Sequence, residues 1–348
     1  MTTDTARLAA SELADLLPVV QAGNRLNRSD CVRLLRTDDL TSLGVLANFV
    51  RERASGNSAY YRRSVHLNPS GIPVPACPEC SAQAAGRRSA LTLEELSSVL
   101  KGIDTGYEGE VHLTGGPGPS GGIDRLCHLV DRIVCTRPRV RLRAFTWQEL
   151  EHAATADGKP PSQVLSAVVN TGLRSLAGGA LVDLSAARPN LSRDDVSVIE
   201  RRMPWIQAAA ELGLNCELSW VFGGNDDPEV LADLLVCVRG IQDVRGIFES
   251  FTPLAFQWPS GDLDLPAPTG YNHLRAVAIG RLFLDNIVRI RSSPFSVSEP
   301  MAQVAQWYGA DDAGSVAPVG SSAVECAPDG RERLRGLIRE AGRDPVEI

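Results

Sequence analysis

The chain has 348 residues, of which 43% are hydrophobic and 22% are charged, a composition that excludes disordered, collagen-like and coiled-coil chains. The 42 Asp and Glu residues outnumber the 35 Lys and Arg residues, so the formal net charge is −7. A chain with this acidic balance is not expected to coat nucleic acid.

The first 60 residues are predicted to be helical, because apolar positions recur at spacings of three and four. The N-terminus has neither a basic start nor a long apolar stretch, so we expect no secretory signal. No apolar run reaches about 18 residues, so no segment is expected to span a membrane. The eight cysteines should then be reduced thiols in the cytoplasm, most of them small core residues.

From about residue 64, short apolar segments alternate with amphipathic segments of helical spacing. The predicted strands are residues 64–68, 109–116, 139–146, 173–179, 215–224, 246–256 and 287–293. The predicted helices between them are residues 91–103, 122–136, 161–173, 195–213, 227–242 and 272–286. Two further helices, 300–310 and 331–342, are predicted near the C-terminus.

This regular alternation predicts an α/β fold with a parallel sheet and helices outside it. Seven strand–helix units favour a TIM-type (β/α) barrel, complete or partial, over an open doubly wound sheet. We expect three parts: a helical lead-in over 1–60, the barrel over 61–295, and a helical extension over 296–348 that packs on the barrel. Active residues of such a fold gather at the carboxyl ends of the strands.

A Pro- and Gly-rich loop with two cysteines, Cys77 and Cys80, follows the first predicted barrel strand. In that position a loop of this kind can hold an iron–sulfur cluster through its thiolates. The same Cys-x-x-Cys spacing occurs in zinc knuckles and in redox dithiol pairs. Zinc would need two more ligands, and the sequence offers no second pair of cysteines at this spacing. A cluster, a zinc ion, a redox pair and two thiols without a metal all remain open.

Motifs of one protein family can be matched along nearly the whole chain. Asn68 and Ser70 stand where one family has the Asn and Thr that open its cluster loop, and Cys77 and Cys80 stand at its last two loop cysteines. Six further segments match motifs of that family in order and spacing: 110–116, 143–149, 251–256, 281–287, 309–312 and 339–346. The chain therefore resembles the radical S-adenosylmethionine superfamily, and within it the aminofutalosine synthase family of menaquinone biosynthesis.

The resemblance implies a [4Fe–4S] cluster on three thiolates, with S-adenosylmethionine bound at the open iron. Cys77 and Cys80 would be metal ligands, and Gly115 and Gly116 would let the backbone approach the methionine end of the cofactor. Asp183, one residue beyond the position of a family glutamate, would hold the ribose. In the family a 5′-deoxyadenosyl radical adds to an enolpyruvyl benzoate, which implies a small anionic aromatic substrate.

Three polar positions of the family are altered in this chain. Pro73, which has no ligand atom, stands at the first loop cysteine, and Val182 stands at the ribose-binding glutamate. Residues 222–226 lack the His and Glu of the fifth-strand motif. One interpretation is a divergent radical enzyme of this type with an impaired or lost cluster. The alternative is a pseudoenzyme or non-radical barrel that binds an anionic aromatic ligand, or a partner of an intact paralogue.

For non-radical chemistry the candidate catalytic residues are His112, Arg143 and Glu149. His66 and His112 alternate with apolar neighbours, which would place them inside the barrel or, alternatively, in the core. Arg143 and Arg291 each lie two residues from another arginine on a predicted strand, so each pair shares one face. Because charge is costly on the helix side, we expect lumen-facing arginines that could meet a ligand carboxylate.

Overall fold

The fold is known from a computed structural model that describes most of the chain. The described residues are 7–71, 90–102, 108–115, 121–180, 193–223, 227–255, 268–294, 296–315 and 330–348. Because these ranges include every predicted strand in whole or in part, they are sufficient to define the sheet.

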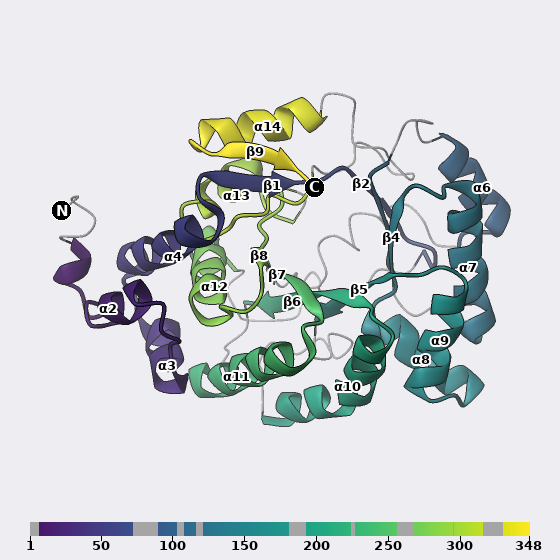
Figure 1. Ribbon diagram of the computed structural model, residues 1–348, viewed down its shortest axis with the longest axis horizontal. Helices are drawn as coiled ribbons and strands as arrows, with labels where there is room; N and C mark the ends of the chain where they lie inside the picture. Colours follow the sequence, from purple (N-terminus) through teal and green to yellow (C-terminus); the bar gives the residue numbers. More distant parts are fainter. Residues whose placement is uncertain are drawn as a thin grey trace, which may run out of the picture.

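A seven-stranded parallel sheet curls around a lumen, with helices on its outer side (Figure 1). The strands follow one another in chain order, and every neighbouring pair is parallel. They are β2 (Ser64–Leu67), β3 (Glu110–Leu113), β4 (Arg141–Ala144), β5 (Ser175–Ala180), β6 (Asn215–Phe222), β7 (Phe248–Ala255) and β8 (Arg289–Ile290). The prediction of an α/β fold with a TIM-type or partial TIM barrel is confirmed.

Helices connect successive strands across the outer face of the sheet. They are α6 (Leu93–Gly102), α7 (Gly122–Thr136), α8 (Trp147–Asp157), α9 (Pro161–Asn170), α10 (Arg193–Glu211), α11 (Pro228–Arg245) and α12 (Gly270–Phe283). All six predicted connecting helices are present, but α8 was not predicted. It begins at a capping box, in which the Thr146 hydroxyl accepts from the backbone N–H of Glu149 and the Glu149 carboxylate accepts from that of Thr146.

The N-terminal region contains α2 (Leu16–Gln21), α3 (Arg28–Arg36) and α4 (Leu40–Ser55). Helix α3 packs on α11 and α4 packs on α12, so these helices form a second layer outside the barrel (Figure 1). Strand β1 (Ser58–Tyr61) follows directly. The prediction that residues up to 60 are helical is therefore wrong at its end, because the chain becomes extended at Ser58.

The C-terminal region contains α13 (Glu299–Ala305), α14 (Gly330–Glu340) and β9 (Asp344–Glu347). Both predicted helices are present, but the strand was not predicted. Strand β9 pairs in parallel with β1, with Ser58 opposite Asp344 and Tyr61 opposite Glu347. A four-residue strand has little signal of its own, and here its partner lies at the other end of the chain.

Residues 311–315 close the gap between the two ends of the curled sheet. On one side the backbone N–H of Ser292 donates to the carbonyl of Asp312 at 2.9 Å. On the other side the N–H of Tyr60 donates to Asp311, and that of Arg62 to Gly314, at 2.7 and 2.9 Å. This segment pairs polar backbone groups that sheet edges would otherwise leave open, so part of the C-terminal region belongs to the barrel wall.

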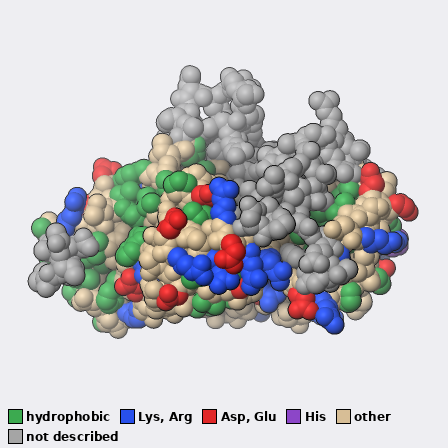
Figure 2. Space-filling view, turned by 90° about the horizontal axis from the view of Figure 1, so that it is seen from above, with side chains coloured by type: hydrophobic (Ala, Val, Ile, Leu, Met, Phe, Trp, Pro, Cys, Tyr) green, Lys and Arg blue, Asp and Glu red, His purple; other side chains and the backbone are tan. Residues whose placement is uncertain are grey.

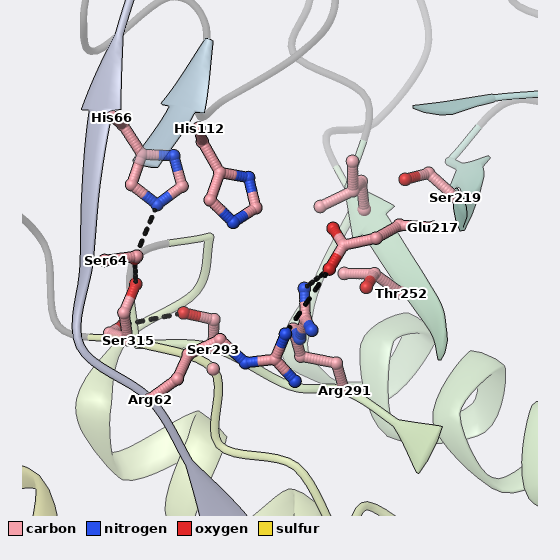
Figure 3. Close-up of a pocket in the computed structure, with 12 residues that line it drawn as sticks. Arg62, Ser64, His66, His112, Glu217, Ser219, Thr252, Arg291, Ser293 and Ser315 are labelled. Atoms are coloured by element: carbon pink, nitrogen blue, oxygen red, sulfur yellow. Dashed lines mark hydrogen bonds and ion pairs between the residues drawn. The ribbon is translucent and has the colours of Figure 1, made fainter. Parts of the chain in front are cut away.

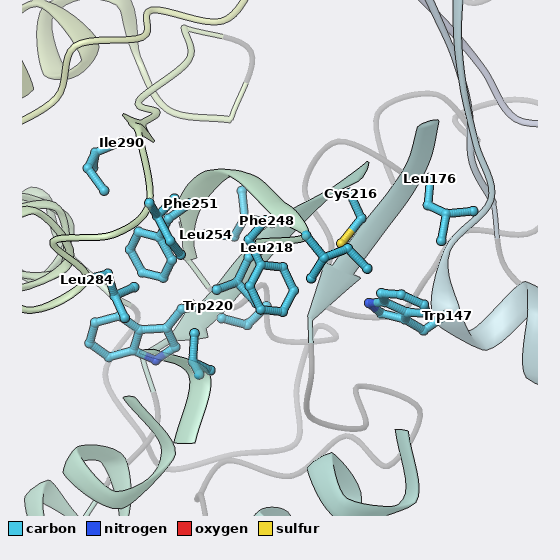
Figure 4. Packing of buried hydrophobic residues seen from close by; sticks show 14 of the residues in the cluster. Trp147, Leu176, Cys216, Leu218, Trp220, Phe248, Phe251, Leu254, Leu284 and Ile290 are labelled. Carbon is cyan, nitrogen blue, oxygen red and sulfur yellow. The ribbon is translucent and has the colours of Figure 1, made fainter. Parts of the chain in front are cut away.

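Apolar side chains fill the space between the sheet and its helices (Figure 4). On β6 the buried residues Cys216, Leu218 and Trp220 face the helices, whereas Glu217 and Ser219 line a cavity in the lumen. This two-residue alternation follows from strand geometry. The core therefore lies outside the barrel, and its interior is left for polar groups.

The surface has charges of both signs in close proximity. Figure 2, the view from the side of α14 and β9, shows basic and acidic side chains next to one another. On α14, Arg331 pairs with Glu347 at 2.5 Å and Arg333 with Glu299 at 2.6 Å.

Among the described helices, none combines the length and the apolar character needed to cross a membrane.

Candidate functional site in the barrel lumen and at its mouth

The chain leaves β2 in a tight turn organised by Asn68. The Asn68 Oδ1 accepts hydrogen bonds from the backbone N–H of Ser70 at 3.1 Å and of Gly71 at 2.9 Å. The Ser70 hydroxyl donates to the same oxygen at 3.0 Å. An Asn side chain that binds the backbone two residues ahead sets the direction of a turn. The exit from β2 is therefore determined by the two residues that match the opening of the family's loop motif.

The two ends of the loop that follows are held together at this point. The backbone N–H of Leu91 donates to the carbonyl of Pro69 at 2.9 Å. Arg125 of α7 donates through Nη2 to both of these residues' carbonyls, at 3.2 and 3.3 Å. The predicted metal ligands Cys77 and Cys80 belong to this loop but lie outside the described residues. Their loop thus begins and ends at the carboxyl end of β2, on the side of a barrel where active residues gather.

Gly115, a predicted cofactor residue, lies just beyond β3 and directly against this turn. A Cβ atom at this position would be 2.3 Å from Asn68 Oδ1 and 2.7 Å from Ser70 Oγ. Glycine is needed here because the backbone approaches the asparagine side chain closely. The other two predicted cofactor residues, Gly116 and Asp183, lie outside the described residues.

Glu149 is buried at the start of α8 and touches the same region. Its carboxylate accepts hydrogen bonds from the backbone N–H and the hydroxyl of Thr146, both at 2.8 Å, and from the backbone of Gly115. Burial raises the pKa of Glu149 to about 8, which outweighs the lowering effect of these hydrogen bonds. This carboxyl group links the end of β3 to α8 and is largely protonated near neutral pH.

A cluster of ion pairs in the lumen centres on Glu110, the first residue of β3. Its Oε2 accepts from Arg143 Nε at 2.7 Å and from Arg62 Nη1 at 3.3 Å, and its Oε1 bonds to Nε2 of His112. Burial alone would raise the pKa of this carboxyl group. The neighbouring His112 and the two arginines outweigh burial and hold the pKa of Glu110 well below its usual range.

Glu217 of β6 and Asp312 of the closing segment complete the network. Figure 3 shows Glu217 facing Arg291 and Arg62. Arg291 donates to Glu217 at 2.5 Å and to Asp312 at 3.2 Å, and Arg62 donates to Asp312 at 2.8 Å. Burial would raise the pKa of Glu217, but Arg291 and Arg143 lower it to about 2. Three guanidinium groups thus face three buried carboxylates inside the barrel. Arg143 also pairs with a fourth carboxylate, that of the less buried Glu249 on β7, at 2.5 Å.

Two stacked histidines lie above this network. The rings of His66 and His112 have centroids 4.4 Å apart and are tilted by 19°. The Nε2 of His66 is 2.9 Å from the hydroxyl of Ser64. Burial, together with the positive charge that His112 can hold, keeps the pKa of His66 well below its usual range. His66 is therefore a neutral ring that is already committed to partners within the lumen.

The free space between these side chains is small. The lumen cavity has a volume of about 30 Å³, which is room for two or three water molecules at about 10–15 Å³ each. Thr252 Oγ1 and Arg143 Nη1 are buried and have no hydrogen-bond partner among the described residues. Water would satisfy such groups, whereas an aromatic substrate needs far more space. The described lumen is therefore a packed polar core without room for an aromatic molecule.

The lumen also brings together three potential metal ligands. One ligand atom each from Glu110, His112 and Glu217 lies within 4.8 Å of the others. Both carboxylates, however, already face buried arginines. A divalent cation would add two positive charges without new anions, at a large cost in a buried site. The geometry is that of an ion-pair network.

The three predicted catalytic residues do not form one group. His112 and Arg143 meet through Glu110, whereas the Glu149 carboxylate is held by Thr146 at the start of α8. Arg143 and Arg291 face the lumen as expected, but the anions they meet there are carboxylates of the chain itself.

Sequence reasoning missed the acidic half of this network. Glu110 and Glu217 each lie two residues before a polar lumen residue, namely His112 and Ser219, so the spacing was a usable signal. Asp312 lies in the matched segment 309–312, but nothing in that motif indicated that its side chain would face the lumen.

A cluster would need a third thiolate ligand besides Cys77 and Cys80, and the other cysteines are the candidates to supply it. Five are described: Cys31, Cys127, Cys135, Cys216 and Cys237. They lie on α3, α7, β6 and α11, away from the exit of β2. Burial raises the pKa of Cys31 to about 12 and that of Cys216 well above its usual range, so both are inert core thiols.

The chain does not reproduce the ligand set of its presumed cluster. Pro73 has no ligand atom, and no described cysteine is available to complete the pair formed by Cys77 and Cys80. Pro73 and Cys326 lie outside the described residues. A cluster held by three thiolates of one loop therefore does not fit this chain.

Comparison with known proteins yields relatives along most of the chain, although no protein-family model matches it. It is 29% identical over 358 residues to aminodeoxyfutalosine synthase from Streptomyces coelicolor, covering 94% of this chain and 90% of the relative. It is 30% identical over 318 residues to 5-amino-6-(D-ribitylamino)uracil–L-tyrosine 4-hydroxyphenyl transferase from Methanoculleus marisnigri, covering 87% and 85%. The crystal structure of methylornithine synthase is similar in fold, with a TM-score of 0.66 and 17% identity over 95% of this chain and 97% of that one.

The curled parallel barrel and these relatives together define a protein of the radical S-adenosylmethionine class. The likeness to methylornithine synthase concerns the fold alone. Within that class, the chain belongs to the family of aminodeoxyfutalosine synthase and its relatives. The resemblance read from the sequence is confirmed.

Proposed function

We propose that this chain is a divergent member of its family that binds a small anionic aromatic molecule but no longer forms the adenosyl radical. The observation that supports this best is the missing thiolate. Pro73 stands at the first ligand position, and the described cysteines offer no replacement. Clusters of this superfamily use three protein thiolates and leave one iron open for the cofactor.

The retained scaffold supports a binding role. The Asn68 turn, the close approach of Gly115 and the Arg125 clamp organise the mouth of the barrel independently of any metal. One relative is named for the transfer of a 4-hydroxyphenyl group, which favours an aromatic ligand. The lumen arginines are neutralised by the chain's own carboxylates, so the ligand would lie above them, towards the loop that follows β2.

The test is anaerobic reconstitution with ferrous iron and sulfide. Bound iron is measured, and so is 5′-deoxyadenosine formed from S-adenosylmethionine in the presence of dithionite. The relative from Streptomyces coelicolor, treated in parallel, checks the procedure. We expect the chain to bind far fewer than the about four iron atoms of a [4Fe–4S] cluster, and to form no 5′-deoxyadenosine. A full iron content together with 5′-deoxyadenosine would overturn the proposal.

Three variants test why the chain would fail to bind iron and to cleave S-adenosylmethionine. Pro73→Cys restores the family's ligand set but is not expected to restore cofactor cleavage, because Val182 and residues 222–226 depart from the family as well. Cys326→Ala tests whether the Cys326 thiol is the third ligand of a cluster. Cys135→Ala, which removes an exposed thiol on α7, is the matched control. Iron that the unaltered chain binds and only Cys326→Ala loses would contradict the proposal.

A further inference from the structure

A second cavity lies on the outer side of the sheet. Its volume is about 200 Å³, and it is bounded by β6, α11, α12 and α3. Along β6 the side chains alternate, so Trp220 and Phe222 line this cavity while Glu217 and Ser219 line the lumen. The sheet therefore separates the two cavities. We refer to this one as the outer pocket.

The walls of the outer pocket are apolar and rigid. Leu35, Leu231, Phe222 and Ile279 line it from four different elements, and each is buried. An apolar cavity of about 150 Å³ is large enough for benzene. The outer pocket thus has room for a single ring with a small polar substituent.

The polar groups at the outer pocket are all hydrogen-bond donors. Trp220 is 8% exposed, and its Nε1–H has no hydrogen-bond partner among the described residues. Asn272 uses its Oδ1 to accept from the backbone N–H and hydroxyl of Thr269, at 2.9 and 2.8 Å, which leaves its amide N–H groups free to donate. Arg275, half-buried on α12, forms no ion pair with any described residue.

Among the described residues that line the outer pocket, none is acidic and could balance Arg275. The nearby acidic residue in the first turn of α11, Glu229, is already bound by Arg28 and Arg36, each at 2.8 Å. Helices α11 and α12 both begin beside the pocket. The Asp227 carboxylate already caps α11 and accepts from the backbone N–H of Glu229 at 2.9 Å, so only the start of α12 is left to favour an added anion. A buried indole N–H without an acceptor is uncommon in proteins. These features together leave the outer pocket with unused donors, which favours a ligand that accepts hydrogen bonds.

We propose that the outer pocket binds a small monocyclic carboxylate. The ring packs between Trp220 and Ile279, and the carboxylate pairs with Arg275. The Nε1–H of Trp220 and the amide of Asn272 are the further donors. The site needs neither iron nor the mouth of the barrel. The binding of a ligand in the outer pocket can therefore be tested independently of the proposed function.

The test is calorimetric titration of the full chain with benzoate, with benzamide as the neutral ligand of the same shape and acetate as the anion without a ring. We expect saturable binding of benzoate, at least about tenfold weaker binding of benzamide, and no detectable binding of acetate. The indole ¹⁵N–¹H signal of Trp220, assigned by its loss in Trp220→Phe, should move on benzoate addition. Equal affinity for benzoate and benzamide, or an unmoved Trp220 signal at saturating benzoate, would refute the assignment.

Two variants separate charge from shape. Arg275→Gln should weaken benzoate binding at least about tenfold and leave benzamide binding unchanged, because a charge-assisted hydrogen bond is lost. Ala276→Leu should abolish the binding of both ligands by filling the pocket, without a change in charge. Arg132→Gln, an exposed arginine on α7, is the matched control. Thermal melts check that each variant is folded. Benzoate affinity that survives both Arg275→Gln and Ala276→Leu would place the ligand elsewhere.

Discussion

Replacing Glu217 by Gln should destabilise the barrel strongly, because the carboxylate holds two buried arginines in place. The substitution keeps the shape of the side chain and removes its charge. Arg291 and Arg143 each then lose one of the carboxylates that they face, at 2.5 and 3.8 Å respectively. The pKa of Glu217 is about 2 against an ordinary 4.5, a difference that corresponds to about 3 kcal/mol. Breaking a buried ion pair on one side typically costs about 3–5 kcal/mol. We therefore expect a loss of about 3–5 kcal/mol in the free energy of unfolding.

The measurement is urea-induced unfolding with linear extrapolation to water. Glu108→Gln is the matched control, because its pair with Arg139 has the same residue types at 3.1 Å but is largely exposed. That control should cost less than about 1 kcal/mol. The reasoning is refuted if Glu217→Gln and Glu108→Gln destabilise the chain equally.

The same residue predicts the direction of a pH effect. The pKa of Glu217 is lower in the folded chain than in the unfolded chain, so its stabilising effect is present above about pH 5. It is lost as the pH falls towards about 2. The Glu217→Gln variant should therefore lose less stability than the unaltered chain over this acid range, when both are followed by urea midpoints.

Three further predictions concern the mouth of the barrel and its wall. Gly115→Ala should lower the free energy of unfolding by about 1–3 kcal/mol in urea titrations, because the new Cβ would lie 2.3 Å from Asn68 Oδ1. Gly336→Ala, in open space within α14, should instead stabilise the chain by about 0.5–1 kcal/mol. Glu149→Gln should flatten the fall in melting temperature between about pH 5 and 8, because the raised pKa of Glu149 makes its ionisation unfavourable in the folded chain. Deletion of residues 344–348 should lower the melting temperature by several degrees, because β1 loses its partner strand.

Each of these predictions can fail clearly. A Gly115→Ala variant as stable as Gly336→Ala would mean that the approach of Asn68 is not tight. If Glu149→Gln melts with the same pH dependence as the unaltered chain, the carboxyl group is not protonated when buried. An unchanged melting temperature after the deletion would show that β9 does not support the barrel wall.

Local patterns in the sequence determined most of the elements of this fold. Strand β6 was predicted over 215–224 and found over 215–222, and helix α7 was predicted at its observed bounds. These elements follow from the period of their own apolar residues, which is a short-range property. The same two-residue period left His66 and His112 open between the barrel interior and the core, and the family motifs singled out Asn68 as the opening of the loop.

Only the tertiary structure decided how distant segments meet. The pairing of β1 with β9, the closing segment 311–315 and the ion pairs of Asp312 all join residues that are far apart in the sequence. Such contacts depend on where the barrel closes, and no local period encodes that. The sequence predicted that the lumen arginines could meet a ligand carboxylate. In the folded chain they pair instead with carboxylates of β3, β6 and the C-terminal region. The chemistry at each position could be read from its residue type, but its partner could be identified only in the folded chain.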